Sequence, residues 1–427
     1  MDGEKFIIRG GKKLSGEIRV QGSKNAALPV LAATLLVQET CSLSNIPLIR
    51  DVGTILEIFK SLGSKITWTS GDLTIDNSDI SNFAPQSDYV RLLRGSVLLL
   101  GPLLARFGEV LMPYPGGDAI GARSIDSHLE GFRALGADVS VGEDHFLKIK
   151  APRLASGKPK LIGAKIVLSE SSVTTTENLM LAAVLAEGET RLRLCAAEPH
   201  VQNLALFLNK MGAKINGAGT PSIDIKGVVR LKGVEHKIIS DSDEAMNLTL
   251  LGAASRSDFY IRDINPDFLE AGIQKLKEIG VALEIGNDFL RLKPPSSIYQ
   301  SFKIQSGLYP KLLTDQIPPF SVLATQAQGT SLIHEWMYEG RLGYINELIK
   351  MGANAVIMDP HRALIVGPTP FHGAELKSLD VRAGMTSIIA ALVAEGESIL
   401  YDAFNIDRGF EKLDERLRKL GADITRM

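Results

Sequence analysis

Six copies of one pattern of apolar and polar positions divide this chain. Each copy is an amphipathic, helix-like segment that ends in a Leu-Gly-Ala-like tripeptide, followed by a short strand-like segment with alternating apolar positions. The glycines recur about every 70 residues, a period that indicates an internal repeat. A glycine directly after a helix commonly closes the last turn in a left-handed conformation, so each tripeptide predicts a helix end. These glycines are Gly63, Gly136, Gly212, Gly280, Gly352 and Gly421.

A second recurring pattern is an Ala- and Leu-rich segment that is apolar on nearly every side. It occurs at residues 179–187, 322–328 and 388–395 and is followed each time by glycine. Helices that are apolar all round are buried, so we expect a buried helix at each place. The surrounding strands are short and alternating, as in Ala282–Ile285 and Phe289–Leu292. Each repeat is therefore predicted to contain two strands, two helices and two further strands, with one helix inside and one outside.

The repeats divide into two lobes of three, because 427 residues are too many for one ordinary core. We expect a first lobe at residues 22–232 and a second lobe at residues 1–21 and 233–427. In this arrangement the N-terminal strands Phe6–Arg9 and Gly16–Val20 belong to the second lobe. The chain then crosses twice between lobes, which favours a hinge and a ligand site in the cleft.

Composition narrows the class of protein. Apolar residues make up 45% of the chain and aromatic residues 6%, which suits a globular core of Leu, Ile, Val and Ala. The charges of the 47 basic and 49 acidic residues nearly cancel, which argues against a nucleic acid or an anionic membrane as the main partner.

Cys41 and Cys195 lie in apolar, strand-like runs and are expected to be buried structural thiols. The longest apolar runs, 28–37 and 97–105, are too short to span a bilayer, and no apolar signal region opens the chain, so we expect a cytoplasmic protein.

The segment Pro113–Arg123 is predicted to be a loop. Two prolines and three glycines in so short a run exclude a helix or a central strand. The loop carries one acid, Asp118, and one guanidinium, Arg123. It is either a surface turn in which Asp118 bonds its own backbone, or a functional loop on a rigid scaffold.

The segment Gln21–Ala27 is predicted to open a helix that runs through Leu36. Ser23 is a candidate N-cap, and Pro29 is expected to be tolerated only within the first turn. Lys24 at such a helix start suits a phosphate or carboxylate, although lysines near helix starts are also commonly solvated.

Two of these motifs resemble the UDP-N-acetylglucosamine enolpyruvyl transferases. They are Gly-Ser-Lys-Asn-Ala-Ala-Leu-Pro at 22–29 and Pro-Gly-Gly-Asp-Ala-Ile-Gly-Ala-Arg at 115–123. The resemblance covers essentially the whole chain and includes Ser169–Met180, Thr314-Asp315, Tyr338–Arg341, Asp380–Ala383 and Asn405–Phe410. It implies an α/β fold, a two-lobed inverted α/β barrel of six βαβαββ-type units, three per lobe.

The resemblance also implies a reaction. In that family the enolpyruvyl group of phosphoenolpyruvate is transferred to the 3-hydroxyl of the sugar nucleotide, through a tetrahedral ketal, in the first committed step of peptidoglycan precursor synthesis. Matching positions imply that Asp118 is the general acid, Asp315 the base facing the hydroxyl, and Lys24 part of the phosphoenolpyruvate clamp with Arg123 and Arg408. The implied substrate-binding residues are Lys24, Asn25, Arg94, Arg123, Ser124, Ile125, Asp126, Ser127, Ser172, Val173, Met337, Arg341, Arg382 and Arg408. The implied partners are these two small-molecule substrates, with no nucleic acid, membrane or obligate protein partner. No sequence feature calls for a metal, flavin or nicotinamide cofactor.

Asp118 is a departure from most of that family, which has cysteine there. An aspartate can deliver the same proton only if it stays protonated when the loop closes, and burial against an anion favours the protonated form. Insensitivity to the epoxide fosfomycin is expected, because its reaction in the family needs a thiolate.

Further departures lie at Glu170, Thr174, Asp241–Asn247 and the residues after Asp315. They leave three hypotheses open: the UDP-N-acetylglucosamine transferase, an enolpyruvyl transferase with another acceptor, or a non-catalytic sugar-nucleotide-binding paralogue.

Overall fold

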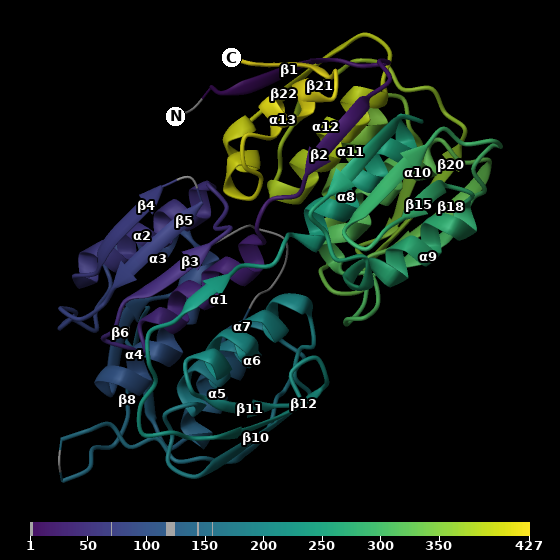
Figure 1. Cartoon of the computed structure of the whole chain (residues 1–427). Coiled ribbons are helices and arrows are strands. Elements are labelled where there is room, and N and C mark those ends of the chain that lie inside the picture. The colour runs from purple at the N-terminus through teal and green to yellow at the C-terminus, as the bar shows by residue number, and fades with distance from the viewer. Residues whose placement is uncertain (1–2, 70, 117–123, 143–144, 156) are drawn as a thin grey trace. The chain divides into compact units, whose positions relative to one another are not determined.

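The computed structural model describes residues 3–69, 71–116, 124–142, 145–155 and 157–427. The chain forms two compact units (Figure 1). The first unit contains the described residues of 22–239, and the second contains residues 3–21 and 240–427. Each unit encloses its own apolar core.

Within the described residues the strands form six small sheets, three in each unit. Five of them share one order, in which the first strand runs parallel to the second and the other two pairings are antiparallel. In the first unit the sheets are β13 (Glu235–Lys237), β3 (Cys41–Ser44), β5 (Asp72–Asp76), β4 (Lys65–Thr69); β6 (Glu109–Pro113), β8 (Phe146–Lys150), β7 (Asp138–Val141); and β9 (Lys165–Val167), β10 (Glu189–Arg193), β12 (Ser222–Lys226), β11 (Lys214–Asn216). In the second unit they are β2 (Ser15–Arg19), β14 (Asp258–Arg262), β16 (Phe289–Lys293), β15 (Ala282–Ile285); β17 (Lys303–Gln305), β18 (Gly329–His334), β20 (Arg362–Gly367), β19 (Asn354–Asp359); and β21 (Glu375–Lys377), β22 (Glu397–Tyr401), β1 (Lys5–Arg9), β23 (Asp423–Arg426).

Each repeat contributes one buried helix and one helix with an exposed face. The buried helices are α1 (Lys24–Thr34), α4 (Leu100–Phe107), α6 (Val173–Ala183), α8 (Ser242–Ala254), α10 (Ile317–Ala324) and α12 (Val381–Val393). The outer helices are α2 (Arg50–Leu62), α5 (Asp126–Ala134), α7 (Pro199–Lys210), α9 (Glu270–Ile279), α11 (Tyr344–Lys350) and α13 (Leu413–Lys419). Shorter helices are α3 (Ser87–Leu92), η1 (Arg94–Leu99), η2 (Pro266–Leu269), η3 (Thr314–Gln316), η4 (Arg341–Gly343) and η5 (Ala403–Arg408).

The glycine that ends each outer helix has the predicted left-handed backbone. The φ angles of the six recurring glycines lie between 92° and 108°. A residue with a Cβ is strained in this region, so glycine lets the chain leave each helix directly for the next strand. The six-fold repeat predicted from these tripeptides is confirmed.

The N-terminal strands belong to the second unit, as predicted. β1 pairs with β22 and β23, and β2 pairs with β14; in Figure 1 the purple β1 lies beside the yellow β22. The predicted boundary at residue 233 is wrong, however. Residues 233–239 belong to the first unit, because β13 supplies the parallel strand that completes the sheet of β3.

Three further expectations need correction. The buried helices begin earlier than predicted, at Val173, Ile317 and Val381. Polar residues in the first turns of α6 and α12, and two prolines in the first turn of α10, are buried with the apolar residues. The sheet of β6, β8 and β7 has three strands among the described residues rather than four. Pro29 lies inside α1 rather than in its first turn, and α1 ends at Thr34. Pro29 has no N–H to donate to the Asn25 carbonyl, a loss that dense packing along α1 offsets.

Both cysteine side chains are buried, as expected. Burial raises the pKa of the Cys195 thiol to about 11 and also raises that of Cys41. Among the described residues, no helix combines the length and the hydropathy needed to cross a membrane.

Candidate active site

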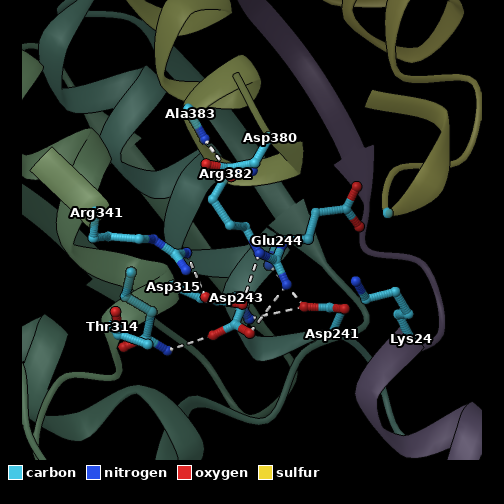
Figure 2. A network of polar contacts seen from close by, with 12 residues as sticks. Lys24, Asp241, Asp243, Glu244, Thr314, Asp315, Arg341, Asp380, Arg382 and Ala383 are labelled. Atoms are coloured by element: carbon cyan, nitrogen blue, oxygen red, sulfur yellow. Dashed lines mark hydrogen bonds and ion pairs between the residues drawn. The ribbon is translucent and has the colours of Figure 1, made fainter. Parts of the chain in front are cut away.

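Asp315 lies on η3, directly before α10, and its carboxylate is held by two arginines (Figure 2). Arg341 Nη2 lies 2.6 Å from Asp315 Oδ1, and Arg382 Nε lies 2.9 Å from Asp315 Oδ2. Both arginine side chains are 5% exposed, whereas the Asp315 side chain is 26% exposed. A ligand therefore reaches the carboxylate more easily than either guanidinium. Each carboxylate oxygen has a second lone pair that can accept a further proton or hydrogen bond.

Asp243, on the first turn of α8, adds a second carboxylate to this group. Its Oδ2 lies 3.3 Å from Arg382 Nη2, and its Oδ1 accepts a hydrogen bond from Gln316 Nε2 at 3.1 Å. Burial raises the pKa of Asp243 to about 7; Arg382 opposes this rise, and the Asp315 and Asp241 carboxylates add to it. Burial alone would lower the pKa of Arg382, but the neighbouring carboxylates, Asp315 first, raise it above its ordinary value.

Two aspartate N-caps fix the backbone beneath these side chains. Asp241 Oδ1 accepts hydrogen bonds from the second and third N–H groups of α8, each at 2.9 Å. Asp380 Oδ1 accepts the corresponding N–H groups of α12 at 2.7 and 3.1 Å. These bonds place Asp243 and Arg382 at the same position of their helices, where both side chains leave the first turn.

Glu335 connects η3 with the segment that follows β18. It is fully buried; its Oε2 accepts the Thr314 hydroxyl at 2.8 Å and its Oε1 accepts the Met337 N–H at 2.8 Å. The backbone at Met337 is therefore tied to the residue that precedes Asp315. Sequence reasoning did not assign Glu335 a role.

Arg408 ends η5, which packs against α12. Asn405 Nδ2 donates to the Ser378 carbonyl at 2.7 Å, and the Arg382 guanidinium lies 5.5 Å from the centre of the Phe410 ring. The second unit thus gathers Asp315, Arg341 and Arg382 into one network, with Arg408 on an adjoining element.

Lys24 begins α1 in the first unit, as predicted. Ser23 caps the helix by accepting the Ala26 N–H at 3.3 Å, and Lys24 Nζ lies 3.6 Å from Asp51 Oδ2. The Lys24 side chain is 15% exposed. Gly22 is required just before, because a Cβ there would lie 1.8 Å from the Asn45 carbonyl oxygen. Asn25, the next residue on α1, is half-buried.

Arg94 and the segment 124–127 lie together in the first unit. Arg94 Nη2 donates to the Ser124 carbonyl at 3.2 Å, and the Ser124 hydroxyl donates to Asp126 Oδ2 at 2.6 Å. Ile125 and Ser127 are buried, whereas Ser124 and Asp126 are exposed. The helix η1, which begins at Arg94, packs on both α1 and α6.

Ser172 caps α6 by accepting the Thr175 N–H at 3.3 Å, and Val173 opens the helix. Thr174 lies beside His128, with 3.2 Å between its Oγ1 and His128 Nε2. Glu170 is exposed. Asp118 and Arg123 lie outside the described residues.

The comparisons with known proteins agree with this arrangement. Residues 8–417 match the family described as EPSP synthase (3-phosphoshikimate 1-carboxyvinyltransferase). The chain belongs to this family. The predicted family of enolpyruvyl transferases, the two-lobed α/β fold and the transferase class are thereby confirmed.

Relatives within the family cover nearly the whole chain. The UDP-N-acetylglucosamine 1-carboxyvinyltransferase 1 of Carboxydothermus hydrogenoformans is 44% identical over 424 residues, which are 99% of this chain and 98% of the relative. The UDP-N-acetylglucosamine 1-carboxyvinyltransferase of Coxiella burnetii is 41% identical over 425 residues, 99% of this chain and 96% of its own.

Two solved enolpyruvyl transferases have the same fold. The enolpyruvyl transferase NikO from Streptomyces tendae superposes with a TM-score of 0.88 at 24% identity, covering 100% of this chain and 99% of its own. EPSP synthase from Acinetobacter baumannii superposes with a TM-score of 0.75 at 19% identity, covering 100% of both chains.

Proposed function

We propose that this chain transfers the enolpyruvyl group of phosphoenolpyruvate to the 3-hydroxyl of UDP-N-acetylglucosamine and releases phosphate. This places it in the synthesis of peptidoglycan precursors, in the cytoplasm. The names and full-length coverage of the relatives support the substrates. The observation that carries the chemistry is the Asp315 carboxylate, partly exposed between two buried arginines.

In the addition step, Asp315 accepts the proton of the acceptor hydroxyl while the hydroxyl oxygen bonds to C2 of phosphoenolpyruvate. The electron pair of the C2–C3 double bond takes a proton at C3, which becomes a methyl group. Asp118 is the donor we assign to this proton. The product is a tetrahedral ketal that still carries the phosphate. A positioned acid and base are each suited to such transfers.

In the elimination step, the Asp118 carboxylate takes a proton back from C3, the C2–C3 double bond forms again, and the C2–O bond to phosphate breaks. The proton held by Asp315 passes to the leaving phosphate, which restores both carboxyl groups to their starting states. The products are the enolpyruvyl ether of the acceptor and inorganic phosphate. Arg341 and Arg382 hold Asp315 in one orientation through both steps, because each binds a different oxygen of its carboxylate.

The cations of the clamp would balance the charge of phosphoenolpyruvate. We assign Lys24, Arg123 and Arg408 to this role, with Arg382 in support. Guanidinium groups suit phosphate and carboxylate because they donate two parallel hydrogen bonds. The nucleotide sugar is assigned to Asn25, Arg94, Ser124, Ile125, Asp126, Ser127, Ser172, Val173, Met337 and Arg341.

A different hydroxylated acceptor is the second candidate. It is favoured by one observation: Asp243, from the segment 241–247 that departs from the family pattern, lies in the network that holds Asp315. A changed residue so close to the base can alter which acceptor hydroxyl the base is placed to meet.

Phosphate release with phosphoenolpyruvate and a panel of acceptors tests the proposal. We expect turnover with UDP-N-acetylglucosamine at a kcat/KM well above the kcat/KM for other nucleotide sugars and for shikimate 3-phosphate. Turnover with another acceptor alone would establish the second candidate. Binding of the nucleotide sugar without any phosphate release would make the chain a non-catalytic paralogue.

A further inference from the structure

Asp243 is a buried carboxylate that shares one partner, Arg382, with the predicted base. Its side chain is 5% exposed, like that of Arg382. Its two oxygens accept from η3 and from α12, through Gln316 at 3.1 Å and Arg382 at 3.3 Å. Arg382 uses Nη2 for Asp243 and Nε for Asp315, so one guanidinium serves both carboxylates at once.

We propose that Asp243 is a positioning residue for the transfer reaction, which shares the Arg382 cation with Asp315 and so sets how strongly that cation holds the base. This inference rests on the proposed function. In this proposal Asp243 does not contact the substrate. It acts through Arg382, whose guanidinium is also fixed over the Phe410 ring.

The charges around Asp243 make this sharing sensitive to pH. Among the described residues, the charged groups that act on it are Arg382 from α12, Asp315 from η3 and Asp241 from the turn before α8. The hydrogen bonds from Arg382 and Gln316 favour its carboxylate, while burial and the two other carboxylates favour the neutral acid. Its pKa of about 7 means that both forms are populated near neutral pH.

The two forms have opposite effects on the reaction. Ionised Asp243 partly neutralises the positive charge of Arg382 and adds a negative charge near Asp315. Asp315 therefore accepts the proton of the hydroxyl more readily. The same charge weakens binding of the anionic phosphoenolpyruvate. As the pH rises through about 7, kcat and the KM for phosphoenolpyruvate should therefore both increase.

Asp243→Asn tests this, with Glu244→Gln as the matched control. Glu244 is fully buried on the same helix turn, but its partners are Arg416, at 2.5 Å, and the Gln21 N–H, at 2.8 Å. At pH 8 we expect Asp243→Asn to lower kcat about ten-fold, because the neutral amide no longer adds negative charge near Asp315, and to lower the KM for phosphoenolpyruvate as well. Its pH profiles should lack the inflection near 7, which Glu244→Gln should retain.

A purely structural role would give a different result, because a disordered site lowers kcat and raises KM. Wild-type profiles in Asp243→Asn, or equal changes in both variants, would overturn the proposal. Gln316→Leu provides a second route if Asp243→Asn does not fold. It keeps Asp243 but removes one hydrogen bond to its carboxylate, so the inflection should move to higher pH; an unmoved inflection counts against the proposal.

Melting of the unliganded protein separates this inference from the proposed function. A carboxyl whose pKa is raised by folding stabilises the protein in its protonated form, and that contribution is lost as pH rises toward 7. The melting temperature of the wild type and of Glu244→Gln should fall more between pH 5 and pH 8 than that of Asp243→Asn. If no acceptor is turned over, the role in catalysis falls with the proposed function, while this comparison still decides whether Asp243 changes its charge near pH 7 beside Arg382. Equal pH dependence in all three proteins would show that the pKa of Asp243 is not raised and would refute the pH-sensitive sharing of Arg382.

Discussion

Replacing Asp315 with asparagine removes the predicted base while keeping the shape of the side chain. Asparagine cannot accept the proton of the acceptor hydroxyl, and general-base catalysis typically contributes about 10²- to 10⁴-fold. We therefore expect Asp315→Asn to lower kcat by about a thousand-fold. Binding of both substrates should persist, because the clamp cations remain in place.

The same change has a cost in stability that the structure lets us bound. Breaking a buried ion pair by removing one partner costs about 3–5 kcal/mol. Here the cost should be lower, about 2 kcal/mol, because the Asp315 side chain is 26% exposed and Arg382 retains Asp243 at 3.3 Å. The amide oxygen can still accept from one arginine, while its NH₂ group faces the other.

The assay measures phosphate release under saturating substrates, substrate binding by calorimetry, and unfolding in urea. Glu278→Gln is the control, because it makes the same chemical change at an exposed surface pair, 2.5 Å from Lys275, where solvent screens the ion pair and its loss changes stability little. The control should match the wild type in all three measurements. A folded Asp315→Asn that keeps more than about a tenth of the wild-type kcat would show that another group is the base.

Three further predictions follow from the loop, the thiols and the helix caps. Fosfomycin should not inactivate the wild type, since a protonated carboxylic acid at Asp118 is a poor nucleophile; Asp118→Cys should gain time-dependent inactivation, and a covalent adduct on the wild type by mass spectrometry would contradict this. Thiol reagents at neutral pH should label neither Cys41 nor Cys195 in the folded enzyme, whose thiols are buried, and labelling without denaturant would be the opposite outcome. Gly280→Ala should destabilise by about 1 kcal/mol in urea, because the φ of 98° is strained for alanine although no atom crowds the site; an unchanged midpoint would refute the cap argument.

The repeat could be predicted from the sequence because it depends on local chemistry. A glycine after an amphipathic helix has few alternatives to the left-handed cap, and the alternating strands next to it have one register that buries their apolar face. The pairing of β13 with β3 could not be predicted in this way. The residues of β13 are few and mostly exposed. They form a strand only by pairing in parallel with β3, which lies far away in the sequence.

The candidate site was predictable only in part. Asp315 and Arg382 stand out through their motifs, yet nothing in the sequence indicates that one guanidinium binds both Asp315 and Asp243, which are far apart in the chain. Buried polar residues also prevented a correct prediction of where α6 begins. Thr175, Thr176 and Asn178 have the composition of a surface turn but are fully buried in α6. Tertiary hydrogen bonds satisfy such groups, and the pattern of hydrophobicity does not report them.

The identity of the nucleotide product tests the central claim most directly. The enzyme would be incubated with phosphoenolpyruvate and UDP-N-acetylglucosamine, phosphate quantified, and the nucleotide analysed by mass spectrometry and carbon NMR. We predict one phosphate released for each enolpyruvyl ether formed, with the ether on the sugar 3-hydroxyl. An unmodified nucleotide sugar after prolonged incubation with folded enzyme, or an ether at another position, would contradict the account.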